Sequence, residues 1–256
     1  MSRQEAYNHY MQALKAGKKY RRKHPDLRVL DEIVDQSQIV SQEDMGIVEI
    51  PMERIVGTKT RGRVAAFAGN FMPLLPTATE FGYKWMGVYE AQISENTELY
   101  PISCFEYLGN FYVQEGNKRV SVLKSMGAPT IPGHVIRLVP AWSREPAVQV
   151  YYEFLRAYEL SGLYQVFFTQ SCSFWKLQEA LGFAYSHVWT QEDRRRFLAG
   201  LLFFREAYEK VGGARFRLTA TDALLIWLRL HRFEELKKWT MGRRSALAAV
   251  EMSAQR

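Results

Sequence analysis

Apolar residues near the N-terminus recur with a helical period. They stand at i, i+3, i+4 and i+7 from Tyr7 to Leu14, a spacing that predicts an amphipathic helix. Ser2-Arg3-Gln4-Glu5 fits a capping box at the start of this helix, which is expected to end near Pro25. The apolar positions of 27–40 fit either a second short helix or an extended arm.

The middle of the chain carries the short apolar runs that are typical of strands. Residues 45–63 start with β-branched residues, so this segment is predicted to begin as a strand. The partly apolar stretch 64–91 is predicted to be helical, with an interruption. Residues 100–107 and 111–115 predict two strands that are joined by a short loop into a hairpin.

A short helix is predicted directly after this hairpin. It covers 117–126, with Gly127 placed to end it and Pro129 just beyond. Residues 133–140 are predicted to form another strand, which ends in a proline. The segment 45–145 therefore combines strands and helices and is predicted to form one domain around a small mixed sheet.

After residue 140 the pattern becomes mostly helical. Thr190-Gln191-Glu192-Asp193 resembles a capping box, and Thr219 or Thr221 can cap a later helix. Helices are predicted at 147–162, 173–182, 191–211 and 222–233, a further amphipathic segment at 234–250, and a strand at 164–169. We therefore predict an α+β protein with three parts: a basic N-terminal helical arm (1–44), the sheet-containing domain (45–145) and a mostly helical C-terminal region (146–256).

The composition is that of a globular protein. Apolar residues make up 47% of the chain and aromatic residues 14%. No run reaches the roughly 18 apolar residues that a membrane-spanning helix needs. The polar N-terminus also lacks the apolar centre of a secretion signal. We therefore expect a cytoplasmic protein with no membrane partner.

The net charge of +7 is unevenly distributed along the chain. Residues 1–24 carry +6, residues 25–190 carry −5, and residues 191–256 carry +6. The basic N- and C-terminal regions are therefore candidates for binding DNA or another polyanion, with solvated helical faces as the alternative. The C-terminal helices can equally serve as a dimerisation module, so a homodimer is a further expectation.

The cysteines and histidines do not form a metal-binding pattern. Cys104 and Cys172 lie far apart in the sequence, and the five histidines are scattered. Both cysteines have apolar or aromatic neighbours. We therefore expect buried, reduced thiols and no metal site.

The strongest candidate site is the turn between the hairpin and the short helix. It consists of Glu115, Gly116, Asn117, Lys118 and Arg119. Backbone N–H groups at a helix N-terminus are unsatisfied and carry a partial positive charge, and glycine lets a ligand approach the backbone. Two cations in the first turn are unfavourable for the helix itself, so they favour a bound anion. The alternative is a surface turn whose cations pair with Glu115.

The elements around this turn follow a characteristic order. An apolar-Pro-Ile strand, a small loop, an aromatic strand ending in acid-Gly-x-Lys-Arg, a helix ending in glycine and a final strand occupy Tyr100–Val139. This order resembles the ParB/sulfiredoxin superfamily, in particular the ParB N-terminal-like domain, and Val48–Arg63 is similar to its opening strand. The resemblance implies that the turn binds nucleotide phosphates, because ParB-type proteins hold the CTP triphosphate there and sulfiredoxins hold ATP phosphate.

The residues of the turn match this family only in part. Gly116, Lys118 and Arg119 match, and Asn117 stands where sulfiredoxins have their reactive cysteine. An amide cannot replace a thiolate nucleophile, so sulfiredoxin chemistry is disfavoured. The resemblance implies a nucleoside triphosphate with Mg²⁺ as the candidate cofactor.

A second group of cations follows the opening strand. It contains Lys59, Arg61 and Arg63. The opening strand lies near the phosphate turn in this superfamily, so the resemblance implies that these cations complete an anion pocket. A solvated loop is the alternative. Glu53 and Glu115 are the nearest candidates for a catalytic carboxylate, and neither has a diagnostic spacing.

The sequence thus favours a bacterial, ParB-like regulatory protein that binds a nucleotide or another phosphorylated ligand. DNA is a further expected partner, as in a transcriptional regulator. One alternative is a phosphotransferase or nuclease of the same superfamily, and another is a non-catalytic protein-interaction module. Whether the protein is an enzyme stays open at this point.

Overall fold

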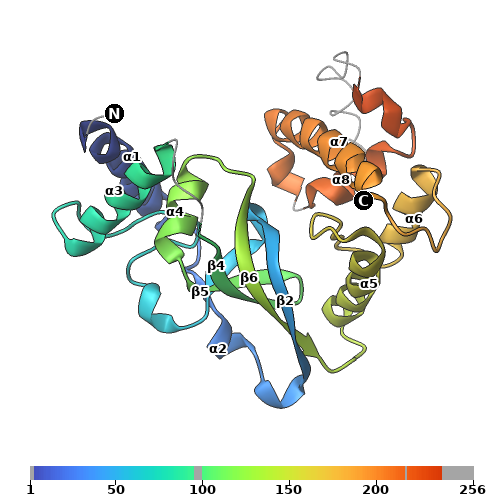
Figure 1. Cartoon of the computed structure of the whole chain (residues 1–256), viewed down its shortest axis with the longest axis horizontal. Coiled ribbons are helices and arrows are strands. Elements are labelled where there is room, and N and C mark those ends of the chain that lie inside the picture. The colour runs from blue at the N-terminus through green and yellow to red at the C-terminus, as the bar shows by residue number, and fades with distance from the viewer. Residues whose placement is uncertain (1–2, 95–99, 217, 238–256) are drawn as a thin grey trace. The chain divides into compact units, whose positions relative to one another are not determined.

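The structure is a computed structural model, and it describes residues 3–94, 100–216 and 218–237 (Figure 1). The chain divides into two compact units, Met1–Ala141 (unit 1) and Trp142–Arg256 (unit 2). Unit 1 combines helices with a six-stranded mixed sheet, and the described part of unit 2 contains helices and no strand. The predicted α+β fold class is therefore confirmed.

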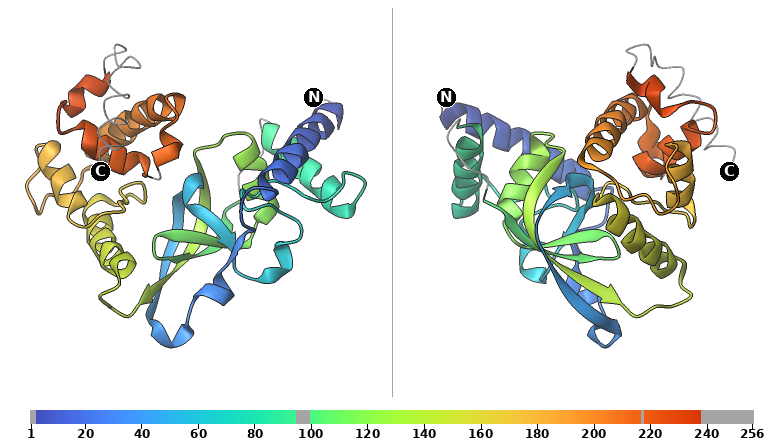
Figure 2. Two further views of the ribbon diagram at one scale, coloured as in Figure 1. Left: turned by 180° about the vertical axis from the view of Figure 1, so that it is seen from behind. Right: turned by 45° about the vertical axis from the view of Figure 1, so that its right-hand side comes forward.

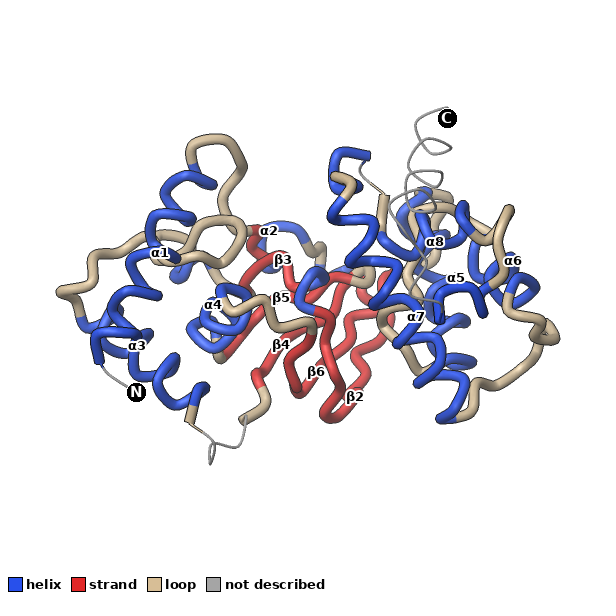
Figure 3. Tube along the Cα trace, turned by 90° about the horizontal axis from the view of Figure 1, so that it is seen from above, coloured by secondary structure: helices blue, strands red, loops and turns tan. Residues whose placement is uncertain are grey.

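The sheet of unit 1 has the strand order β1-β3-β5-β4-β6-β2, and Figure 3 shows it from above. The β4–β6 and β3–β5 pairs are parallel, whereas the β4–β5 and β2–β6 pairs are antiparallel. The strands are β1 (Arg28–Val29), β2 (Ile39–Pro51), β3 (Ile55–Thr58), β4 (Ile102–Tyr107), β5 (Asn110–Glu115) and β6 (Thr130–Pro140).

The predicted hairpin between β4 and β5 is confirmed. Asn110 already pairs with Tyr107, so only Leu108 and Gly109 form the loop. Both loop residues have positive φ, 50° and 72°, as the two-residue type I′ turn requires. This tight turn fixes the register of the two central strands, and it therefore determines where β5 ends.

The described residues of unit 1 form four α-helices. They are α1 (Arg3–Arg21), α2 (Leu30–Ile33), α3 (Glu80–Ile93) and α4 (Asn117–Ser125). The apolar stripe predicted for α1 packs on α3, where the rings of Tyr10 and Trp85 meet edge to face at 5.1 Å. The indole N–H of Trp85 donates to Ser121 of α4 at 2.8 Å. These contacts join α1, α3 and α4 into one layer, which Figure 2 shows from two further sides.

Three predictions for unit 1 need correction or restriction. Residues 64–79 form turns and one bridge between Phe67 and Pro73, and the helix starts only at Glu80, because prolines break the helical ladder. Residues 39–44, assigned above to the helical arm, are the start of β2. Half of the predicted capping box at Ser2 lies outside the described residues.

Unit 2 is built around a core of aromatic side chains. Trp189, Phe197, Phe204 and Trp227 are all buried within it. The helices are α5 (Pro146–Ser161), α6 (Ser173–Ala180), α7 (Gln191–Lys210) and α8 (Ala220–Trp227), with short 3-10 helices at Gly213–Phe216 and Phe233–Lys237. The predicted capping box of Thr190 and Asp193 at the start of α7 is confirmed.

The strand predicted at 164–169 is wrong. These residues form turns and coil, and their backbone is satisfied by α8 instead of by a neighbouring strand. The amide of Thr169 donates to Asp222 at 3.1 Å, and Thr221 donates to the carbonyl of Gln165 at 2.9 Å. Thr219 forms the capping box of α8, which ends at Trp227 and so before 233. Most of the predicted segment 234–250 lies outside the described residues.

The two cysteines have different environments. Cys104 is buried, as predicted, but Cys172 is exposed, which corrects the expectation of two buried thiols. Cys172 caps α6 with a φ of 61°, so it sits at a surface turn. Over the described ranges, no cluster of three or more possible metal ligands occurs. The helices that the structure describes are all too short or too polar to cross a bilayer.

A buried ion pair ties the centre of the sheet together. Glu106 of β4 is 0% exposed, and its Oε2 accepts from Nε of Arg137, the residue opposite it in β6, at 2.7 Å. Oε1 of Glu106 accepts from the amide of Gly109 in the hairpin loop at 2.6 Å. Arg137 also approaches Glu43 of β2, at 3.7 Å. One carboxylate thus links β4, β6 and the hairpin.

We expect R137M to lower the free energy of unfolding by about 3–5 kcal/mol, because it leaves the buried Glu106 charge without its partner. The double variant E106Q/R137M should lose less than R137M alone, since the unpaired charge is then removed. K84M is the control, because Lys84 pairs with Glu80 in solvent, and such pairs contribute about 0–1 kcal/mol. Urea denaturation measures all three, and equal losses for R137M and K84M would contradict the assignment.

Lys124 of α4 is held in a largely apolar environment. Its Nζ donates to the carbonyl of Ile55 at 2.8 Å and lies 5.3 Å from the ring centre of Phe71. Burial lowers the pKa of Lys124 to about 8, although the nearby Glu53 opposes the shift. The folded state therefore binds this proton less tightly than the unfolded state, whose lysine has its ordinary pKa of about 10.4.

Because of Lys124, the free energy of unfolding should rise with pH between the pKa of its folded form and that of its unfolded form. Between about pH 8 and pH 10 the unfolded state binds more protons, so deprotonation favours the folded state. We expect the unfolding free energy of the wild type, relative to K124M, to increase on the order of 1 kcal/mol across this range. It should stay constant from pH 6 to 7. Thermal or urea denaturation at each pH tests this, and a difference that is flat up to pH 10 would refute it.

Candidate functional site

The turn from β5 into α4 has the geometry that its sequence predicts. β5 ends at Glu115, Gly116 is the N-cap with φ 99°, and α4 begins at Asn117. A Cβ atom on Gly116 would lie 2.6 Å from Cγ2 of Ile102 in β4, so only glycine fits here. Gly127 follows the other end of α4 with φ 76°, as predicted. The turn is thus a fixed part of the sheet-to-helix packing.

A cavity of about 220 Å³ opens at this turn. Residues from three places along the chain line it. The turn contributes Gln114, Glu115, Gly116, Asn117, Lys118 and Arg119, α3 contributes Phe81 and Val88, and the segment before α3 contributes Arg63 and Phe67. The structure therefore brings together all five predicted turn residues and one of the three cations predicted near them.

The cations at this cavity repel one another. The ammonium of Lys118 lies 5.0 Å from the ring centre of Phe81. The pKa of Lys118 is lowered, first by burial and then by the positive charges of Arg63 and Lys84, and Glu80 opposes this shift. The described part of the chain provides no ion pair for Arg63. The cavity therefore has a positive potential that an anionic ligand would relieve.

The start of α4 leaves polar groups without partners. Gly116 has no side chain, so no side-chain cap accepts from the first N–H groups of the helix. Asn117 is only 6% exposed, and its buried Oδ1 accepts no hydrogen bond from any described residue. An unsatisfied buried acceptor costs about 1–3 kcal/mol. The start of α4 thus offers N–H donors to an anion, and the Asn117 oxygen is a buried acceptor that no described residue satisfies.

Arg119 has a structural role beside its place at the cavity. Its Nη1 donates to the carbonyl of Pro101 at 2.9 Å and also to the carbonyl of Tyr100. The guanidinium therefore ties the turn to the residues that precede β4. Because part of its hydrogen-bonding capacity is used, Arg119 presents fewer donors to a phosphate than a free arginine would.

Lys59 and Arg61 are directed away from the cavity. Lys59 pairs with Asp31 at 3.0 Å, and Nε and Nη2 of Arg61 donate to the two carboxylate oxygens of Glu32, at 2.6 and 2.8 Å. The two acids belong to α2, which lies beside β3 in the chain's fold. Of the three cations expected to complete the anion pocket, Arg63 alone lines it. Asp31 and Glu32 were the sequence signal that Lys59 and Arg61 would be paired elsewhere.

The two carboxylates considered for catalysis lie in different places. Glu115 lines the cavity and is exposed. Glu53 belongs to the 3-10 helix Met52–Arg54, where its charge acts on Lys124, and it does not line the cavity. Any catalytic or metal-binding role for a carboxylate at this cavity therefore points to Glu115.

The apolar wall of the cavity was missed at the sequence level. Phe81 and Val88 lie on the face of α3 that approaches α4, and Phe67 lies in the turns before it. The available signal was Thr79, whose side chain caps α3 by accepting from Gly82 at 3.1 Å. A helix start at residue 80 places Phe81 and Val88 on one face, because they are seven residues apart.

The basic ends of the chain are described only in part. Lys15, Lys18, Lys19 and Arg22 are exposed on or just after α1. Many of the C-terminal cations, such as Arg243 and Arg244, lie outside the described residues. DNA binding through these regions, and a homodimer, stay predictions.

We expect G116A to be much more destabilising than G127A. Both glycines have positive φ, which costs an alanine about 1–2 kcal/mol. A Cβ on Gly127 meets nothing within 4 Å, whereas one on Gly116 meets Ile102, and such overpacking adds about 1–3 kcal/mol. Urea denaturation of both variants isolates the contact, and equal losses would show that Ile102 does not constrain the turn.

The comparisons with known proteins do not assign this chain to a family. No family model, no curated protein and no solved structure matches the chain. The features that bear on function are therefore those of the cavity itself: the cations Arg63 and Lys118, the buried acceptor of Asn117 and the start of α4 without a side-chain cap.

Proposed function

We propose that unit 1 binds a nucleotide or another phosphorylated ligand at the β5–α4 turn, as a cytoplasmic, ParB-like regulatory protein. The observation that carries this proposal is that two cations, Lys118 and Arg63, line the same cavity. Lys118 is partly desolvated there, and the helix that starts at this cavity has no side-chain cap. Lys118 is partly buried beside the exposed Arg63, and an anion that binds both cations would offset their mutual repulsion. Phosphate suits this environment, since it accepts from both backbone N–H groups and cations.

The size and walls of the cavity indicate which part of a ligand it receives. Its volume of about 220 Å³ is below the 300–1,000 Å³ that is typical of sites enclosing a whole drug-sized ligand. It therefore suits the phosphate groups and an adjoining sugar. Phe81 and Val88 offer an apolar surface beside the turn that the sugar would contact.

A divalent ion would enter this site with the phosphates. Mg²⁺ is commonly held by one or two carboxylates together with substrate phosphates and water. Glu115 is the carboxylate that lines the cavity among the described residues. A nucleoside triphosphate with Mg²⁺ therefore fits the residues present, with Glu115 facing the metal and the cations facing the phosphate oxygens.

We expect K118A and R63A each to weaken binding of CTP, ATP or GTP at least tenfold, which corresponds to about 1.4 kcal/mol. K59A is the matched control, because Lys59 is paired with Asp31 outside the cavity, and it should bind as the wild type does. Arg119→Ala is less informative, since it also releases the carbonyls of Tyr100 and Pro101. Calorimetric titrations with Mg²⁺ present measure all of these.

Two results would refute the proposal. Negligible heats with all three nucleotides and with inorganic phosphate, for the wild type and every variant, would leave the cavity without its ligand class. A loss in K59A as large as that in K118A would place binding elsewhere on the surface. Retained affinity in K59A together with loss in both cavity variants is the outcome that supports it.

A further inference from the structure

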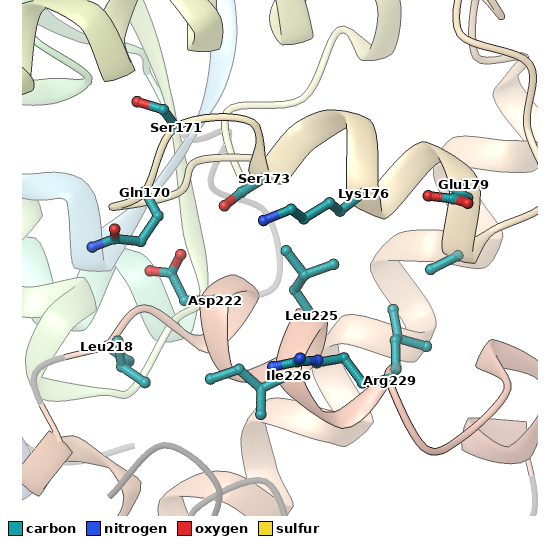
Figure 4. A pocket seen from close by; sticks show the side chains of 12 residues that line it. Gln170, Ser171, Ser173, Lys176, Glu179, Leu218, Asp222, Leu225, Ile226 and Arg229 are labelled. Atoms are coloured by element: carbon teal, nitrogen blue, oxygen red, sulfur yellow. The ribbon is translucent and has the colours of Figure 1, made fainter. Parts of the chain in front are cut away.

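A second cavity, of about 440 Å³, lies entirely within unit 2, between α6 and α8 (Figure 4). Its volume falls in the range of small-molecule sites. Leu218, Leu225, Ile226 and Leu228 provide its apolar lining. Leu225 is partly buried and packs against the aromatic core of unit 2, so this lining is continuous with the core and leaves a hollow that the described residues of unit 2 do not fill.

Two cations line this cavity from opposite elements. Lys176 comes from α6 and Arg229 from the residues that follow α8. In Figure 4 the side chain of Leu225 lies between them. The described residues give neither cation an ion pair or a side-chain hydrogen bond. Both charges are thus available to a ligand that reaches across the apolar wall.

The two acids at the cavity form no ion pair with these cations among the described residues. Asp222 accepts from the hydroxyls of Thr169 and Thr219, at 3.0 and 2.7 Å, so its carboxylate is engaged in capping α8. Glu179 lies farther along α6, and the ammonium of Lys176 points away from it in Figure 4. The hydroxyl of Ser173 and the amide of Gln170 add uncharged polar groups to the same side.

We propose that this cavity binds a small molecule with one anionic group and an apolar body, such as a fatty or aromatic carboxylate. The anionic group would be bound by Lys176 and Arg229, and the apolar body would lie against Leu225 and Ile226. Inorganic phosphate alone would leave the apolar wall exposed to water, and a neutral hydrocarbon would gain nothing from the two exposed cations. A ligand with both an anionic group and an apolar body can contact the cations and the apolar wall at the same time.

The test is equilibrium dialysis of the full chain against octanoate, with octanol and inorganic phosphate as separate comparison ligands. The wild type should bind octanoate at least tenfold more tightly than either comparison ligand. K176Q/R229Q should lose that preference by tenfold or more, and K210Q is the matched control. Lys210 is an exposed cation at the end of α7 that does not line the cavity, so K210Q should bind octanoate normally.

A second variant locates the apolar part of the ligand. L225W places a larger side chain in the cavity and should abolish octanoate binding while leaving the exposed cations in place. A thermal unfolding curve with a single sharp transition establishes that each variant is folded. K118A, in the cavity of unit 1, should bind octanoate as the wild type does, so this test is independent of the proposed nucleotide site.

The proposal is overturned by any of three results. Octanoate binding that is absent from the wild type removes the ligand class. Equal affinities of K176Q/R229Q and K210Q show that the two cations do not hold the anionic group. Octanol or phosphate binding as tightly as octanoate shows that only one half of the lining is used.

Discussion

The left-handed turn at Gly116 is the constraint on which the candidate site depends. The chain must pass from β5 into α4 while the side chain of Ile102 fills the space where a Cβ would be. Ile102 also packs over Gly133 of β6, where a Cβ would lie 3.0 Å from its Cγ1. One isoleucine thus packs against both β6 and the start of α4, so the helix N–H groups and Lys118 are held at the cavity by the sheet.

Several other charged side chains of unit 1 are paired with an opposite charge. Glu106 and Arg137 are buried together with good geometry, and Lys59 and Arg61 are paired with the acids of α2. Lys118 and Arg63 differ from these pairs, because they stand near one another at a cavity. Natural sequences keep such local conflicts chiefly where function requires them. This contrast is a stronger argument for a ligand than the presence of cations alone.

The sequence predicted the elements whose signals are local. The hairpin at Leu108-Gly109, the helix that ends before Gly127 and the capping box at Thr190 each depend on a few neighbouring residues, and all three are present. The errors arose where distant residues decide the structure. Residues 164–169 have a strand-like composition, but the cap residues of α8 satisfy their backbone.

In the candidate site, too, the sequence predicted what depends on neighbouring residues and missed what depends on distant ones. The turn could be found from the sequence because its five residues are consecutive, whereas Phe81 joins it only through the packing of α3 on α4. Lys59 and Arg61 looked equivalent to Arg63 until the fold placed Asp31 and Glu32 beside them. The cavity in unit 2 had no sequence signal, because its cations come from segments more than 50 residues apart, around positions 176 and 229.

Ligand binding at the two cavities should differ in its salt dependence and its heat-capacity change, so the two proposals can be distinguished. The site at Gly116 is dominated by cations and helix N–H groups, so its affinity should fall steeply as salt screens them. The cavity between α6 and α8 combines two cations with an apolar wall, so burial of apolar surface should persist at high salt and give a negative heat-capacity change on binding. Because each cavity lies within one unit, each can be occupied without any requirement on the other.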